Sequence, residues 1–180
     1  MSDKIGELIN SPDGNYLVDP YARIAVQELK ARYFYYIDTR QFSRLPSLFT
    51  DDARLEGFAF APDQSVSVEQ FVTDAGRFLA GRNSQHHGFM RAVSDTVVRA
   101  RWSMRDLVTW EPGEKSYRNI SHPDLSGFVG YGYYESEYRY SDGAFKIQFL
   151  RATRVRIDLL YGPRPSDGRG APPPDTEWLP

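Results

Sequence analysis

Two kinds of hydrophobic pattern divide the chain into a helical first part and an extended second part. In the first part, apolar residues recur at three- and four-residue spacing, which is typical of amphipathic helices. Asp19-Pro20 is a start signal for the first helix, and Ser67-Val68-Glu69-Gln70 forms a capping box for a later one. A short strand is expected over 53–60, followed by a turn at Pro62-Asp63. The expected helices cover about 20–38, 42–49 and 67–81.

The second part consists of long segments rich in Val, Ile, Tyr, Phe, Trp and Arg, each bounded by turn residues. Ser94-Asp95 and Ser141-Asp142-Gly143 predict two hairpins, and a polar loop over 111–126 separates them. Helices followed by long antiparallel strands indicate an α+β fold. A strongly curved, mostly antiparallel sheet would wrap around the N-terminal helices as a cone-shaped barrel with a central pocket. The expected strands are 85–93, 96–110, 128–140 and 144–158.

The length of 180 residues suits one domain with a single core. That domain is expected over 19–161. Residues 1–18 form an expected N-terminal arm, and the Pro-rich segment 162–180 forms a C-terminal arm that packs on a neighbour or is disordered.

Composition narrows the classes of function. Net charge is −2 and no basic stripe is visible, which argues against a nucleic-acid partner. No apolar run approaches the ~20 residues that span a bilayer, and the start of the sequence lacks a signal-peptide pattern. The absence of cysteine excludes thiolate chemistry and fits a reducing compartment. We therefore expect a soluble, cytoplasmic protein without disulfides.

The candidate chemistry centres on a histidine pair. The chain has three histidines, and His86 and His87 stand side by side in a predicted strand. Histidine is the readiest general acid or base near neutral pH. Alternation along a strand allows only one of the two to face the cavity, and periodicity leaves open which one. The alternative for either is a half-buried histidine bonded to backbone. Neighbouring strand residues point apart and no third ligand is indicated, so no metal site is expected.

Two charged residues extend this candidate site. Asp38 follows the aromatic end of the first helix, where it either pairs with a nearby arginine or orients an imidazole at the pocket rim. Arg151 is expected to share a face with Phe145, Ile147 and Phe149, where it could hold a developing anion. The competing interpretation is a rim charge or an ion pair with Glu135 or Glu137.

Aromatic residues make up 14% of the chain, and tyrosine suits an apolar pocket that must offer hydrogen bonds. Core packing is an equally good explanation for Trp102 and Tyr133. The candidates for substrate contacts are Tyr36, His87, Trp102, Tyr133 and Phe149.

Several segments together resemble the SnoaL-like branch of the nuclear transport factor 2-like superfamily. The resemblance spans roughly 18–158 and implies a curved sheet wrapped by three helices, assembled as a homodimer or homotrimer. The long 111–126 loop departs from the general pattern. The segments that carry the resemblance are Ala25-Val26-Gln27-Glu28-Leu29-Lys30-Ala31-Arg32-Tyr33, Ile37-Asp38-Thr39-Arg40, Leu48-Phe49-Thr50-Asp51-Asp52-Ala53, Gly132-Tyr133-Tyr134-Glu135-Ser136-Glu137-Tyr138-Arg139 and Asp142-Gly143-Ala144-Phe145-Lys146-Ile147.

Closest in layout are cofactor-independent lyases of the scytalone dehydratase, bile acid dehydratase and hexachlorocyclohexane dehydrochlorinase types. In these enzymes an aspartate ending the first helix pairs with a histidine on the strand after the third helix. The resemblance assigns these roles to Asp38 and His86, with Tyr33 and Arg151 as charge-stabilising groups.

The expected function is a cofactor-free, dehydratase-like lyase acting on a small apolar or aromatic molecule. A ketosteroid-type isomerase would use Asp38 directly, and His86 could then be dispensable. A polyketide cyclase or a formaldehyde-releasing lyase on lignin-type aromatics fits the same residues. A non-catalytic ligand-binding or association domain is the alternative outside enzymology.

Overall fold

Helix α1 (Pro20–Asp38) begins where the sequence predicts it. In this computed structural model, which describes residues 18–58, 61–78, 83–110, 123–163 and 175, the Asp19 carboxylate accepts hydrogen bonds from two backbone N–H groups of the first turn. The donors are Tyr21, at 2.9 Å, and Ala22, at 3.2 Å. The face of α1 that turns into the protein consists of Ala22, Val26, Leu29, Lys30, Tyr33, Phe34 and Ile37.

Two further helices follow the predicted order. The segment η1 (Phe42–Leu48) is a 3-10 helix that contains Pro46. Helix α2 (Val68–Phe78) follows Ser67, whose hydroxyl accepts a hydrogen bond from the Gln70 N–H at 3.2 Å, as the capping box predicts.

Six strands form one sheet in the order β2-β1-β6-β5-β4-β3. The β1–β6 pair is parallel and the other pairs are antiparallel, so the predicted α+β fold with a mostly antiparallel sheet is confirmed. The strands are β1 (Phe49–Phe58), β2 (Ala61–Val66), β3 (Asn83–Ser94), β4 (Val97–Thr109), β5 (Leu125–Ser141) and β6 (Ala144–Tyr161).

Strand β2 was not expected, because its sequence contains Pro62-Asp63 and reads as a turn. It pairs with β1 alone, with Val66 opposite Leu55 and Ala61 opposite Phe58. Such an edge position tolerates a proline, whose missing N–H is not needed by a second neighbour.

The two predicted hairpins are present. The β5–β6 turn has Asp142 at φ 53° and Gly143 at φ 81°, as a two-residue turn with left-handed backbone requires. Strands β3 and β4 pair from Ser94 opposite Val97 outward.

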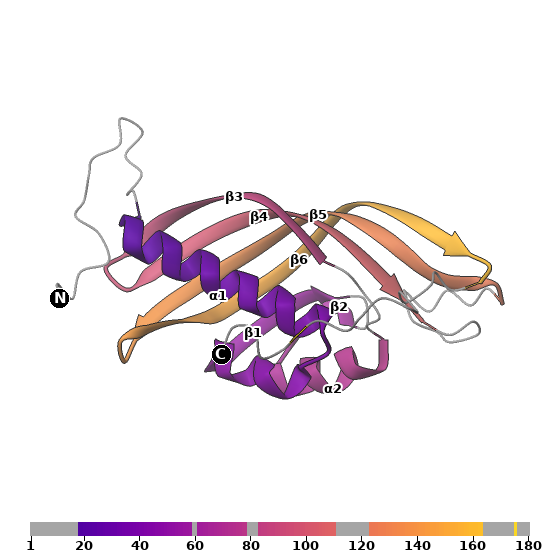
Figure 1. The fold of residues 1–180 in the computed structure, drawn as a ribbon, viewed down its shortest axis with the longest axis horizontal. Coiled ribbons are helices and arrows are strands. Elements are labelled where there is room, and N and C mark those ends of the chain that lie inside the picture. Colours follow the sequence, from indigo (N-terminus) through magenta and orange to yellow (C-terminus); the bar gives the residue numbers. More distant parts are fainter. Residues whose placement is uncertain (1–17, 59–60, 79–82, 111–122, 164–174, 176–180) are drawn as a thin grey trace.

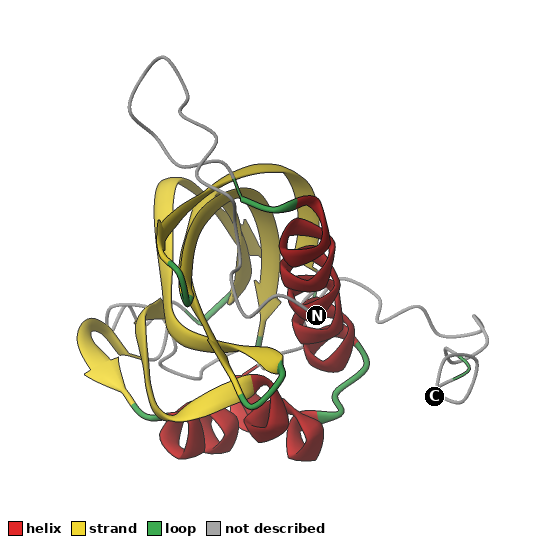
Figure 2. Ribbon diagram, turned by 90° about the vertical axis from the view of Figure 1, so that its left-hand side faces the viewer, coloured by secondary structure: helices red, strands yellow, loops and turns green. Residues whose placement is uncertain are grey.

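The sheet curves strongly, and α1 lies along its concave side, with the shorter helices beside β1 (Figures 1 and 2). Inner-face residues of β4 and β5, including Trp102, Tyr134 and Tyr138, are buried against this helical layer. Charged residues alternate with them on the opposite face. The sheet therefore has an aromatic inner face and a charged outer face.

The predicted arms, 1–18 and 162–180, and the 111–126 loop lie mostly outside the described residues and stay predictions. Within the described part of the chain, no helix is long and apolar enough to cross a membrane.

Candidate active site

Tyr33 is the centre of an aromatic cluster between α1 and the inner face of the sheet. Its side chain is buried, and its ring meets those of Phe34, Phe49 and Tyr134 edge-on, with centroids 5.5, 6.1 and 6.4 Å away. Burial raises the pKa of Tyr33 well above its usual value, and burial likewise raises the pKa of Tyr134. Both phenols therefore stay protonated near neutral pH and can donate hydrogen bonds.

Asp38 is the last residue of α1 and is exposed, at the end of the helix rather than within the aromatic cluster. Its negative charge contributes to raising the pKa of both Tyr33 and Tyr134.

The histidine pair lies in β3, on the sheet edge that α1 packs against. The side chains of His86 and His87 lie outside the described structure, but their backbone register is informative. Gln85 lies opposite Met104 and Gly88 lies opposite Trp102, so two histidines oppose the single residue Ser103. This β-bulge interrupts the alternation on which the sequence argument relied.

Gly88 has a packing role beside the histidines. A Cβ added there would lie 2.2 Å from Cε3 of Trp102. Trp102 lies opposite Gly88 on the neighbouring strand β4, and its side chain is buried. Its indole N–H donates a hydrogen bond to the Tyr138 hydroxyl at 3.0 Å. Trp102 thus belongs to the inner aromatic layer, and only glycine leaves room for it under β3.

Arg151 does not join this cluster, and the expectation that it shares a face with Phe145 and Ile147 is wrong. The register of β6 shifts after Ile147, because Ile147 lies opposite Tyr138 whereas Phe149 lies opposite Glu137. This bulge moves Phe149 and Arg151 to the outer face, and the residues that turn inward after it are Leu150 and Ala152.

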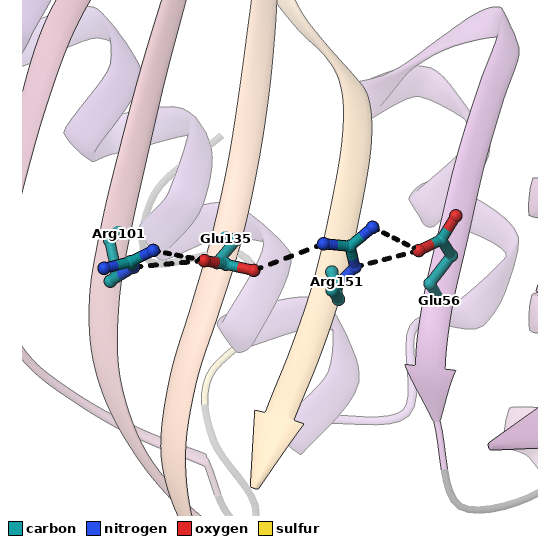
Figure 3. Close-up of polar contacts among 4 residues, drawn as sticks. All are labelled: Glu56, Arg101, Glu135 and Arg151. Carbon is teal, nitrogen blue, oxygen red and sulfur yellow. Dashed lines mark hydrogen bonds and ion pairs between the residues drawn. The ribbon is translucent and has the colours of Figure 1, made fainter. Parts of the chain in front are cut away.

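On the outer face, Arg151 is part of a row of alternating charges (Figure 3). Its guanidinium donates to the Glu56 carboxylate, with Nε–Oε2 2.8 Å, and lies 3.6 Å from Glu135. Glu135 also accepts from Arg101. The hydrogen bond that Arg151 donates to Glu56 raises the pKa of Arg151. The ion-pair interpretation of Arg151 is therefore the one observed.

Tyr133 and Phe149 also lie on the outer face. Tyr133 is 43% exposed, and the Phe149 ring centroid lies 5.0 Å from Cζ of Arg151. A hollow of about 710 Å³ on this face has Phe149, Arg151 and Glu135 in its wall. Tyr134, next to Tyr133, occupies the inner position instead. The last substrate-contact candidate, Tyr36, is partly buried against the core.

Sequence reasoning missed a buried ion pair between Arg154 of β6 and Asp106 of β4. The two side chains are 8% and 3% exposed, and Arg154 Nε lies 3.1 Å from Asp106 Oδ2. Arg154 also donates to the Gly57 carbonyl at 2.8 Å. Arg154, not Arg151, is the inward-facing arginine of the last strand, and the bulge in β6 hides this from strict alternation.

Lys30 was missed as well, although its helical spacing from Val26, Tyr33 and Ile37 places it on the apolar face of α1. Its side chain is fully buried. In the part of the chain that is described, no group of three or more His, Cys, Asp or Glu residues is placed to hold a metal ion.

The sequence matches the SnoaL-like domain family over residues 21–151, and the chain belongs to that family. No curated protein sequence matches the chain significantly.

Solved structures share the fold at low sequence identity. A type 2 hexachlorocyclohexane dehydrochlorinase (LinA) superimposes with a TM-score of 0.62 at 18% identity, covering 81% of this chain and 93% of the other. The LinA-type3 enzyme from Novosphingobium barchaimii gives 0.61 at 19%, covering 80% and 93%. A protein assigned as a scytalone dehydratase from Novosphingobium aromaticivorans gives 0.60 at 16%, covering 80% and 91%.

Proposed function

We propose that this protein is a cofactor-independent lyase that catalyses a dehydratase-like elimination on a small apolar or aromatic molecule. The observation that carries the proposal is that α1 ends in the carboxylate of Asp38 and carries Tyr33 in its last turns, where Tyr33 is buried against Tyr134 of the sheet. Burial raises the pKa of both tyrosines, so their hydroxyls are protonated donors. Membership of the SnoaL-like family and the lyases among the structural neighbours support the same class of reaction.

In the proposed reaction, His86 is the general base that removes a proton from carbon. Asp38 orients the imidazole and stabilises its protonated form, which is the usual base-plus-orienter arrangement. The Tyr33 hydroxyl, kept protonated by its raised pKa, donates a hydrogen bond to a substrate oxygen or to the leaving group. A base positioned in this way contributes ~10²–10⁴-fold to the rate.

The substrate would lie beside the inner aromatic layer, to which the buried Tyr33 and Trp102 belong. Arg151, Tyr133 and Phe149 have no part in this proposal, because they lie on the other face of the sheet.

The test is a screen of small hydroxy-ketones, phenols and steroids, with thermal shift reporting binding and absorbance reporting the conjugated product. On any compound turned over, His86→Gln and Asp38→Asn should each lower kcat by ~10²–10⁴-fold. The matched control is the exposed Asp51→Asn, which should change kcat less than about tenfold. His87→Gln is measured beside it to compare the two histidines.

Other outcomes separate the alternatives. Loss of activity in Asp38→Asn with full activity in His86→Gln would replace the lyase by an isomerase-type reaction in which the carboxylate moves the proton. Loss of activity in His87→Gln alone would identify His87, the second histidine of the bulge, as the general base. Ligands bound equally by wild type and all variants, and never consumed, would overturn the enzyme in favour of a binding domain.

We also propose a homodimer or homotrimer, as the resemblance to the superfamily implies. Light scattering on the purified protein should give two or three times the mass of 20.7 kDa. A monomer at all concentrations would contradict this part of the proposal.

A further inference from the structure

Lys30 is a buried amine that the proposed reaction does not use. It lies on the inward face of α1, one turn before Tyr33, and its relative exposure is 0%. Among the residues that the structure describes, none accepts a hydrogen bond from Nζ. A lysine in such a position is uncommon, because lysine is almost never fully buried unless it is paired.

Three aromatic rings surround the amine. Nζ lies 4.2 Å from the ring centroid of Tyr134, 4.7 Å from that of Tyr33 and 4.9 Å from that of Phe34. Rings at these distances attract a cation through their faces, but they do not replace the hydrogen bonds that an ammonium makes in water. Burial lowers the pKa of the Lys30 side chain well below its usual value.

In the same interior, an arginine shows how this chain accommodates a buried side chain that keeps its charge. Arg154 is buried with a carboxylate partner, Asp106, and a carbonyl partner, Gly57. Lys30 has neither kind of partner among the described residues. The contrast favours an uncharged amine at Lys30, with its lone pair available to an electrophile.

We propose that Lys30 is a nucleophile that forms a reversible imine with the carbonyl group of an aldehyde or ketone, with aromatic carbonyl compounds as the preferred class. A carbonyl compound that reaches Nζ would lie among the rings of Tyr33, Phe34 and Tyr134, which favours an aromatic one.

The step balances without an added reagent. The amine lone pair attacks the carbonyl carbon, and the carbonyl π electrons move to oxygen, which takes up a proton to give a carbinolamine. The hydroxyl then leaves as water while the nitrogen gives up its remaining proton, so that an amine and a carbonyl compound become an imine and water. The apolar surroundings disfavour the reverse attack by water.

This inference goes beyond the Asp38–His86 proposal and does not depend on it, because imine formation requires no elimination. Asp38→Asn should slow the proposed lyase reaction by the factor given above and leave the imine chemistry of Lys30 in place. Lys30→Met should abolish the imine whether or not the elimination takes place.

The experiment is reductive trapping on the full-length protein. Wild type, Lys30→Met and the matched control Lys146→Met are incubated at near-neutral pH with benzaldehyde or 4-hydroxybenzaldehyde and sodium cyanoborohydride. The reductant delivers hydride to the imine carbon and converts it to a stable secondary amine, which intact mass and peptide mass spectrometry then locate. Lys146 is a partly exposed lysine on β6 and reports ordinary surface reactivity.

We expect one dominant adduct on the Lys30 peptide in wild type and in Lys146→Met, formed at least tenfold faster than any other amine adduct. Lys30→Met should lose that adduct and retain only the slow surface labelling. An unlabelled Lys30 peptide in folded wild-type protein, or labelling unchanged in Lys30→Met, would overturn the proposal and leave Lys30 as an ammonium held by the three rings. Because peptide mapping on wild type decides the matter, a poorly folding variant leaves the test intact.

Discussion

The two faces of the sheet treat charged side chains in opposite ways. On the outer face, Arg101, Glu135, Arg151 and Glu56 alternate in sign across four neighbouring strands, and each contacts an opposite charge (Figure 3). These side chains keep between 29% and 50% of their exposure, so water already solvates them. Pairs of this kind are worth about 0–1 kcal/mol each.

On the inner face, charge is scarce and each instance is costly to bury. Arg154 and Asp106 satisfy each other there, whereas Lys30 meets only rings. A fold selected for stability alone would place an apolar side chain at Lys30. The outer charges are paired and solvated, whereas the inner amine departs from a local packing rule, as residues at functional sites often do.

The largest loss of stability is expected when the inner ion pair loses one partner. Arg154→Met would leave Asp106 as a buried carboxylate without its guanidinium, at a cost of about 3–5 kcal/mol. Urea denaturation should show this loss in the free energy of unfolding. The exposed Arg156→Met, which removes a pair with Asp158, is the matched control and should cost less than about 1 kcal/mol. Equal losses in the two variants would contradict the distinction between the faces.

Lys30→Met should act in the opposite direction and stabilise the protein by about 1–3 kcal/mol at neutral pH, because it removes a buried amine that makes no hydrogen bond. The lowered pKa means that the unfolded chain binds a proton that the folded chain does not, so wild-type stability rises with pH toward ~10.4. The nearby charges of Asp38, Asp106 and Arg154 are the same in both proteins.

The gain from Lys30→Met should therefore shrink above about pH 10, where the unfolded lysine also loses its proton. Denaturation at a series of pH values measures the slope of the difference between the two proteins. A variant less stable than wild type at every pH would mean that the three rings hold an ammonium with net benefit.

Gly88→Ala tests how closely the edge of the inner face is packed. The added methyl group would meet the buried Trp102 ring at 2.2 Å, and overpacking of this kind costs about 1–3 kcal/mol. Thermal unfolding and the tryptophan fluorescence spectrum should both shift. On the open β5–β6 turn, Ser141→Ala is a control whose melting temperature should stay close to that of wild type. An unchanged melting temperature and fluorescence spectrum in Gly88→Ala would mean that the Trp102 ring does not lie against Gly88.

The smallest effect is expected on the outer face. Glu135→Gln removes the central acid of the charged row but leaves Arg151 paired with Glu56, so the loss should be below about 1 kcal/mol. It should shrink further when the unfolding is repeated at ~1 M salt, which screens exposed charges. A loss of stability comparable to that of Arg154→Met would show that the outer row of charges stabilises the fold as strongly as the inner ion pair does.

Local signals in the sequence were sufficient for much of the fold. Asp19-Pro20 marked the start of α1, the capping box at Ser67 marked α2, and the β5–β6 turn at Asp142-Gly143 was recognisable because its geometry demands such residues. Strand β2 escaped because its polar, proline-containing sequence is stabilised only by pairing with β1.

The site was harder to predict, because two bulges break the alternation that assigns residues to faces. One bulge contains His86 and His87, and the other moves Arg151 outward and brings Arg154 inward. Bulges depend on pairing with the neighbouring strand and leave no local signature in these segments.

Two other placements were readable in the sequence. Tyr133 alternates with Glu135 and Glu137, which favours the solvent face, and Lys30 falls at helical spacing between apolar residues. Both signals follow from periodicities of two and 3.6 residues. A residue of unusual polarity on a buried face is thus a sequence-level indicator in its own right.

The parallel pairing of β1 with β6 has a consequence for the order of folding. Strand β1 ends at Phe58, yet its partner on the side opposite β2 does not begin until Ala144. During synthesis, one edge of β1 therefore remains unpaired until β6 has left the ribosome. Contacts over such long sequence separations slow folding, so the nascent chain depends on late closure of the sheet and is exposed to aggregation before it.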